Sequence, residues 1–166
     1  MAPMGLRFRW MDLAESNGKQ SSIELAVIEF NGRCDVGGLT ARDESSGPLG
    51  WTHVSDGVIL PFANVDCAAV RGFIQKELRD MCLQARAATF GRALGRVLAH
   101  ELYHIFANTK RHGSEGVARE FYSARDLLAA DFQFQARESM ALINGKAHAA
   151  LVNAAAGLME EAEHRY

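Results

Sequence analysis

The chain has 166 residues, of which 48% are hydrophobic, and its formal net charge at pH 7 is -2, so it suits one compact domain. The basic residues are scattered, and their densest run, residues 110–112, is too short to follow a phosphate backbone, so we expect no nucleic-acid partner. No apolar run approaches the roughly 18 residues that span a bilayer, and we expect no membrane partner. We expect residues 1–166 to form a single domain, cytoplasmic as the sequence stands or exported if a signal peptide was removed.

The first half of the chain predicts strands and loops. Leu6, Phe8 and Trp10 alternate with other side chains at the period of a half-buried strand. Residues 23–30 fit a strand and also a helical stripe, and their β-branched content favours the strand. Residues 33–50 are rich in Gly, Ser, Asp and Glu, which indicates an exposed loop.

A hairpin follows this loop. Residues 50–54 and 58–62 are two short apolar segments separated by Ser55-Asp56-Gly57, and Asp-Gly favours the positive φ angles of a tight turn. Pro61 has no N–H to donate, so at least one side of the second strand should be an edge or a bulge.

The second half changes to helical periodicity. Apolar residues recur every three or four positions over residues 66–80 and 87–107, and a final helix is predicted over residues 137–163. Ser123 and Asp126 are spaced as the capping start of a further short helix. Strands followed by helices predict an α+β fold, in which a mixed or antiparallel sheet packs on long helices.

The cysteines do not form a recognisable metal motif. Cys34, Cys67 and Cys82 are far apart and include no C-x-x-C pair, which argues against a cysteine zinc site. Free buried thiols are the simplest expectation. If the protein is exported, one disulfide becomes possible, and Cys34 with Cys67 is the pair that we expect.

Three of the six histidines fall within thirteen residues. His100 and His104 are four residues apart on the predicted second helix, so both rings can point at one spot. Glu101 lies about 100° round the helix from His100, where its carboxylate can reach a water on the same ion. The spacing therefore predicts a metal ion held by two imidazoles, with a general base beside it.

A third protein ligand is expected from the segment that follows the helix. The helix should end around residues 107–109, because asparagine tolerates the left-handed conformation that terminates helices. The returning chain would then bring His112 to the ion, and Glu115 and Glu120 are alternative ligands. Imidazole ligands favour zinc, although iron, cobalt or nickel can also occupy three nitrogens.

Residues 100–104 read His-Glu-Leu-Tyr-His and match the H-E-x-x-H motif of the zincin superfamily of metallopeptidases. The third histidine resembles the metzincin arrangement, but His112 follows His104 by eight residues, where metzincins have six. Ser139-Met140 is the one candidate for the methionine turn of that group. A gluzincin-like arrangement would instead use Glu138 as the third ligand.

The resemblance implies a zincin-like fold, a Zn²⁺ cofactor and hydrolysis of peptide bonds in a peptide or protein substrate. Glu101 would act as the general base, and Tyr122 is the candidate donor to the tetrahedral oxyanion. The hairpin strand before the active-site helix would pair with an extended peptide. Asp126 is a candidate partner for the free nitrogen of a ligand imidazole.

Two other functions remain open at this point. In one, the protein is a metal-binding module without turnover, in which the ion staples the segment around His112 to the helix. In the other, it is a helix-rich interaction protein that binds no metal. The remaining histidines, His53, His148 and His164, are expected at the surface.

Overall fold

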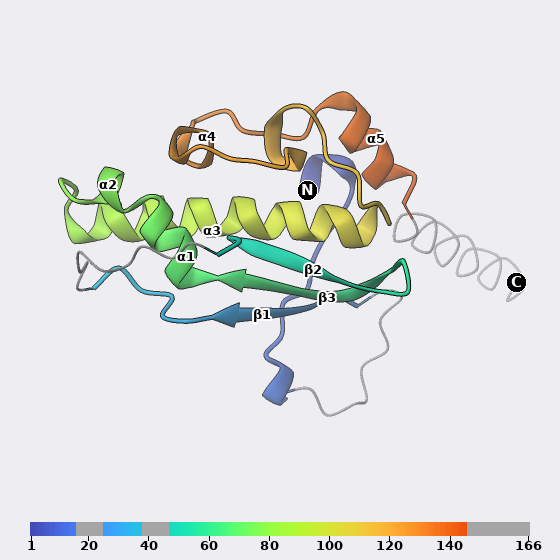
Figure 1. Cartoon of the computed structure of the whole chain (residues 1–166), viewed down its shortest axis with the longest axis horizontal. Helices are drawn as coiled ribbons and strands as arrows, with labels where there is room; N and C mark the ends of the chain where they lie inside the picture. The colour runs from blue at the N-terminus through green and yellow to red at the C-terminus, as the bar shows by residue number, and fades with distance from the viewer. Residues whose placement is uncertain (16–24, 38–46, 146–166) are drawn as a thin grey trace, which may run out of the picture.

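The computed structural model describes residues 1–15, 25–37 and 47–145. The described helices and strands are η1 (Ala2–Met4), η2 (Leu13–Glu15), β1 (Val27–Asn31), β2 (Gly50–Ser55), β3 (Val58–Asp66), α1 (Cys67–Phe73), α2 (Gln75–Leu78), α3 (Leu83–Phe106), η3 (Gly116–Ala118), α4 (Ala124–Leu128) and α5 (Ala136–Ile143). The sheet lies on one side of α3, and α4 and α5 lie on its other side (Figure 1). These layers confirm the predicted α+β class.

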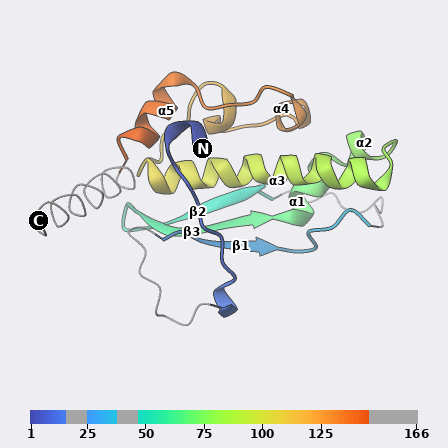
Figure 2. The same ribbon diagram turned by 180° about the vertical axis from the view of Figure 1, so that it is seen from behind.

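The strands form a mixed sheet in the order β1-β3-β2. The first strand pairs with β3 in parallel, from Val27 opposite Phe62 to Asn31 opposite Asp66. The second strand pairs with β3 in antiparallel register and forms one edge of the sheet. Two opposite views place β2 next to α3 and β1 farthest from it (Figures 1 and 2).

The predicted hairpin is confirmed, including its turn and its irregularity. Asp56 and Gly57 both have positive φ, 50° and 79°, as a tight Asp-Gly turn requires. The register changes from Thr52 opposite Ala63 to Val54 opposite Ile59, so β3 carries extra residues around Pro61. This bulge accommodates the missing N–H of the proline, as we predicted.

The N-terminal segment is not a strand, and that prediction was wrong. Residues 6–10 form no regular element, yet Leu6 is buried, Phe8 is half-buried and Trp10 is exposed. The ring of Phe8 lies 5.3 Å from that of Phe106 at the end of α3. The apolar alternation thus marks an extended segment that packs on a helix without a neighbouring strand to pair with.

The remaining first-half predictions hold only in part, because residues 25–26 of the predicted strand are irregular and Val36 of the predicted exposed loop is buried. The first strand begins at Val27, and residues 23–24 of the predicted strand lie outside the described residues. Of the predicted loop, residues 33–37 and 47–49 are irregular, and residues 38–46 lie outside the described residues. A disulfide joins Cys34 to Cys67, with Cα atoms 5.0 Å apart, so the pair that we expected in an exported protein is the one that forms. The expectation of free buried thiols was therefore wrong, because Cys34 and Cys67 are joined and Cys82 is free but exposed.

The helix predicted over residues 66–80 is two short helices. Asp66 caps α1 by accepting a hydrogen bond from the Ala69 N–H at 2.8 Å, and the chain leaves helical geometry at Ile74 before α2 begins. The long helix α3 starts at Leu83, four residues before its predicted start. No helix among the described residues is long and apolar enough to cross a bilayer.

The predicted start of α4 is confirmed, whereas α5 ends earlier than predicted. Ser123 and Asp126 form the expected capping box at the start of α4. The helix predicted over residues 137–163 is confirmed as far as Ile143, where α5 ends; residues 144–145 are not helical, and residues 146–163 of that prediction lie outside the described residues. Asn144 is the C-cap of α5. The next residue is a glycine because the chain passes close to the end of α3 there, where a Cβ would lie 2.0 Å from the Phe106 carbonyl oxygen.

Two hydrophobic clusters hold α3 in place. Its first half packs against the sheet and α1 through Phe90, Ala93 and Val97, which are nearly inaccessible to solvent. Its last turns pack through Leu102 and Phe106 into a second cluster that includes α5 and the N-terminal segment. Because apolar contacts fix the helix on several sides, the polar side chains near residues 100–104 are held in a fixed orientation.

Candidate metal centre

The last two turns of α3 bring the rings of His100 and His104 together edge to face, with an angle of 80° between their planes. Both rings are buried, at 7% and 8% exposure, and their Nε2 atoms lie 3.0 Å apart. Four residues along an α-helix turn the side chain by about 400°, so the second ring lies above the first. The predicted convergence of the two imidazoles is therefore present.

Each of these rings is anchored through its other nitrogen to a backbone carbonyl. His100 Nδ1 lies 2.8 Å from the Val117 oxygen, and His104 Nδ1 lies 2.7 Å from the Thr109 oxygen. A carbonyl can only accept, so both Nδ1 atoms carry the proton and both Nε2 atoms present a lone pair. Two lone pairs at 3.0 Å repel each other unless a cation lies between them. Anchoring of the non-ligating nitrogen is also typical of metal-bound histidines.

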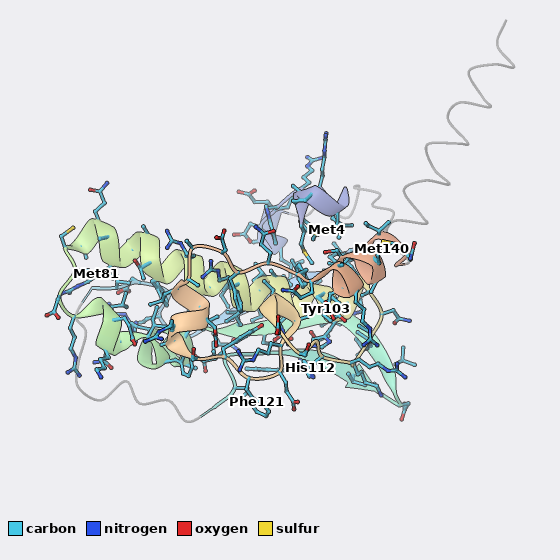
Figure 3. All side chains as sticks on the ribbon, turned by 90° about the horizontal axis from the view of Figure 1, so that it is seen from above. Met4, Met81, Tyr103, His112, Phe121 and Met140 are labelled. Carbon is cyan, nitrogen blue, oxygen red and sulfur yellow. A yellow bond between two sulfur atoms is a disulfide. The ribbon has the colours of Figure 1, made fainter. Side chains whose placement is uncertain are left out.

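His112 completes the cluster from the segment that follows α3. The helix ends at Phe106, and Asn108 adopts a left-handed conformation with φ 47°, as predicted. The ring centroid of His112 lies 5.2 Å from that of His100 and 4.8 Å from that of His104. Figure 3 shows His112 on this returning segment, on the same side of α3 as Phe121.

The geometry of the three rings fits a divalent ion. One nitrogen from each of His100, His104 and His112 lies within 4.8 Å of the others. Tetrahedral zinc, with Zn–N bonds of about 2.0 Å, needs ligand nitrogens roughly 3.3 Å apart, and small ring rotations close that difference. Among the described residues, these three histidines are the group of His, Cys, Asp or Glu side chains that can meet at one ion.

Burial disfavours the charged form of the two helical histidines. It lowers the pKa of His100 to about 4, although the Val117 carbonyl acts in the opposite direction, and the two neighbouring imidazoles lower it further. The pKa of His104 is also lowered, mainly by burial. Both rings are therefore neutral at pH 7, which is the state that binds a metal ion.

Glu101 is buried next to this cluster, with 4% of its surface exposed. Its Oε2 accepts a hydrogen bond from the Thr52 hydroxyl at 2.8 Å, which ties the helix to the edge strand β2. Burial raises the pKa of Glu101 to about 7, and the Thr52 hydrogen bond lowers it in part. The absence of a side chain at Gly50 prevents a steric clash with Glu101. A Cβ at that position would lie 3.1 Å from Glu101 Oε1 and 2.9 Å from the Val97 side chain.

Tyr122 lies behind His100, on the side away from the other rings. Its hydroxyl is 2.7 Å from His100 Nδ1 and also donates to the Val117 carbonyl oxygen. The role that we predicted for this phenol, donation to the oxyanion, stays a prediction; in this structure the hydroxyl contacts the His100 ring and the Val117 carbonyl. Burial raises the pKa of Tyr122, so the hydroxyl keeps its proton at neutral pH.

The alternative ligands do not join the cluster of His100, His104 and His112. Glu115 is exposed, Glu120 lines the adjoining cavity, and Glu138 is buried on α5.

Two further predictions concern residues around the site. Asp126 accepts from the Ser123 N–H and hydroxyl and pairs with Arg119 at 3.3 Å, so the prediction that it orients a ligand imidazole was wrong. Ser139-Met140 lies within α5, and Met140 is 53% exposed, so this pair forms no turn beneath the cluster.

Of the other histidines, the structure describes His53, which lies outside the cluster. The His53 ring lies in hydrogen-bond contact with Asn64 Oδ1 at 2.6 Å and is exposed, as expected. His148 and His164 lie outside the described residues.

A cavity of about 280 Å³ opens between β2 and the end of α3. Its walls include all three histidines and Glu101 on one side, and strand residues such as Trp51 and Val54 on the other. Both strand side chains are partly exposed, at 36% and 46%. The cavity therefore joins the candidate metal site to the free edge of the sheet.

The chain shows no significant match to a protein-family model, to a curated protein or to a solved structure. The resemblance to zincins therefore depends on the motif and on the geometry of these side chains.

Sequence reasoning missed four contributors to the site. They are Thr52, Gly50 and the carbonyls of Val117 and Thr109. The role of Thr52 becomes visible only in the structure, from its hydrogen bond to Glu101. Backbone carbonyls are present in every residue, so no sequence signal marks the ones that contact the rings. The glycine at position 50 could have been noticed as the residue that opens the hairpin, since glycine often marks a close approach.

Proposed function

We propose that this protein is a zinc-dependent metallopeptidase with His100, His104 and His112 as the metal ligands and Glu101 as the general base. One observation carries the proposal. Two buried imidazoles, each with its Nδ1 held by a carbonyl, direct their Nε2 atoms at one point beside a buried carboxylate. A packed core does not need such an arrangement, because it leaves two nitrogen lone pairs without partners.

Zinc is the ion that three neutral imidazoles favour, and it would supply Lewis acidity at this point, lowering the pKa of a bound water. With three protein ligands, the fourth coordination position remains for that water, as in catalytic zinc sites. The cavity next to the cluster provides room for it.

Glu101 has the environment of a general base. Its carboxylate lies one residue after a ligand and is held by the Thr52 hydroxyl at 2.8 Å. In the metal-free protein burial raises its pKa to about 7, which favours acceptance of a proton by this carboxylate. The carboxylate takes a proton from the attacking water and passes it to the leaving amine of the substrate.

The edge strand β2 supports a peptide as the substrate. It pairs with β3 on one side, and among the described residues no strand pairs with its other side. An extended peptide can add to such an edge through backbone hydrogen bonds, with its side chains in pockets on alternating sides. The cavity beside Trp51 and Val54 lies where such a peptide would pass the metal ligands.

A structural metal site is the second candidate function. The returning segment that carries His112 has few apolar contacts of its own, so an ion could fasten it to α3. The two functions differ at the fourth coordination position. A protein ligand there, for which Glu120 is the candidate from the cavity wall, would close the site and exclude catalysis.

The disulfide between Cys34 and Cys67 supports a place of action outside the reducing cytoplasm. Disulfides persist in oxidising compartments and are rare in the cytosol of mesophiles. We therefore propose that the peptidase acts in an oxidising compartment.

The test begins with elemental analysis of the purified protein and cleavage of a quenched-fluorescent peptide library. We expect one zinc per chain and peptide cleavage that Glu101→Gln abolishes while the zinc remains bound. A protein that binds no metal at neutral pH with zinc present would refute the proposal. Full peptide turnover by Glu101→Gln would remove the assigned base, and zinc binding without any cleavage would favour the structural role.

A further inference from the structure

A second, larger cavity of about 660 Å³ adjoins the metal site. It shares two wall residues, His112 and Glu120, with the cavity beside Glu101. Its remaining walls come from the segment after α3 and from the start of α5, including Arg111, Gly113 and Glu138. A substrate at the metal site can therefore extend into this second cavity.

The wall of this cavity contains a buried carboxylate whose hydrogen-bonding capacity is unmet. Glu138 is 5% exposed, and its Oε2 has no hydrogen-bond partner among the residues that the structure describes. The other oxygen packs against Gly113, where a Cβ would lie only 2.9 Å from Oε1. A buried carboxylate oxygen without a hydrogen-bond partner is costly, and such an atom in a native protein commonly marks a bound ligand, ion or water.

The nearby arginines do not neutralise this carboxylate. Arg111 and Arg137 also line the cavity, but both are exposed, and neither forms an ion pair with Glu138 in the described part of the chain. Their guanidinium groups can remain in water at the rim while Glu138 lies in the wall. The position of the negative charge thus favours a positively charged group inserted from the cavity.

We propose that the second cavity is a substrate subsite in which Glu138 binds a cationic group of the peptide. The proposal rests on the proposed peptidase function and names the substrate class of that site. A lysine or arginine side chain and a free α-amino group offer the same chemistry, a charged N–H donor to a carboxylate. Such a charge-assisted hydrogen bond is worth on the order of tenfold in affinity.

The test measures binding without turnover, in zinc-loaded protein that carries Glu101→Gln. The probes are dye-labelled hexapeptides of Ala and Gly with one lysine at each position in turn, and the same peptides with norleucine. Each is prepared with a free and with an acetylated α-amine. We expect one lysine position, or the free α-amine, to improve affinity on the order of tenfold, and these two arms identify the source of the charge.

Adding Glu138→Gln should reduce the ratio of affinities for the cationic and uncharged peptides to near one. Glu115→Gln is the matched control, because it replaces the same type of side chain at an exposed position that does not line the cavity and should leave that ratio intact. Glu138→Asp keeps the charge and should retain part of the preference, which covers the case in which the amide variant does not fold.

The subsite proposal is overturned if no cationic peptide binds more tightly than its uncharged counterpart, or if the preference survives Glu138→Gln. Failure of the proposed peptidase function would be seen in a different experiment. In that case zinc-loaded protein with Glu101 intact would not cleave these peptides.

Discussion

Replacing Glu101 with glutamine should make the metal-free protein more stable at alkaline pH. Burial raises the pKa of this carboxyl from 4.5 to about 7, so the folded protein resists its ionisation. Below pH 4.5 the Glu101 carboxyl is protonated in both the folded and the unfolded protein, so it does not lower the unfolding free energy. Between pH 4.5 and 7 the unfolded chain releases the proton and the folded chain keeps it, so stability falls as the pH rises.

The size of the effect follows from the same shift. A pKa difference of this extent corresponds to about 3 kcal/mol of unfolding free energy, fully developed above pH 7. Glutamine cannot ionise, and its amide oxygen can still accept from the Thr52 hydroxyl. Glu101→Gln should therefore exceed wild type by about 3 kcal/mol at pH 8 and by less than about 1 kcal/mol at pH 5.

Urea denaturation with a chelator present, at both pH values, measures this difference. The neighbouring His100 titrates in both proteins, so its contribution cancels in the comparison. Added zinc should reduce the gain at pH 8, because a cation beside the carboxylate favours its charged form. A gain that is the same at pH 5 and pH 8, or a loss at pH 8, would show that Glu101 is not held in a desolvated environment.

Three other changes test separate parts of the structure. Thr52→Val removes the hydrogen bond that lowers the pKa of Glu101, so the acidic limb of the kcat/KM profile should move to higher pH, whereas Thr52→Ser should leave it in place. Tyr122→Phe should weaken zinc binding by roughly tenfold in a competition assay with a chelator dye, since the phenol supports the anchor of a ligand ring; unchanged affinity would contradict that role. Reducing the disulfide should lower the unfolding free energy by about 4 kcal/mol, because the cysteines are 33 positions apart and the unfolded chain gains the conformational entropy of that loop. Equal urea midpoints before and after reduction would disprove this.

Local features of this protein follow from its sequence because they depend on neighbouring residues. The Asp-Gly turn, the capping box at Ser123 and the end of α3 near Asn108 each rest on the conformational preference of one or two residues. The convergence of His100 and His104 belongs to the same class, since the helical repeat alone sets it.

Other features were decided by contacts between segments that are distant in the chain. Residues 6–10 have the alternation of a strand, but a strand needs a partner, and the tertiary structure offers the side of α3 instead. The position of Tyr122 in the chain indicates that it lies near the site. Only the fold shows that its hydroxyl contacts His100 Nδ1.

The amino-acid sequence by itself determined which side chains could bind an ion and which carboxylate stands beside it, because one helix carries most of them. Tertiary structure alone decided the environment that tunes those groups: the carbonyls behind the two rings, the Thr52 hydroxyl on Glu101 and the unpartnered Glu138 in the adjoining cavity. Burial and hydrogen bonding across tens of residues have no local sequence pattern, since each requires two segments to meet in space.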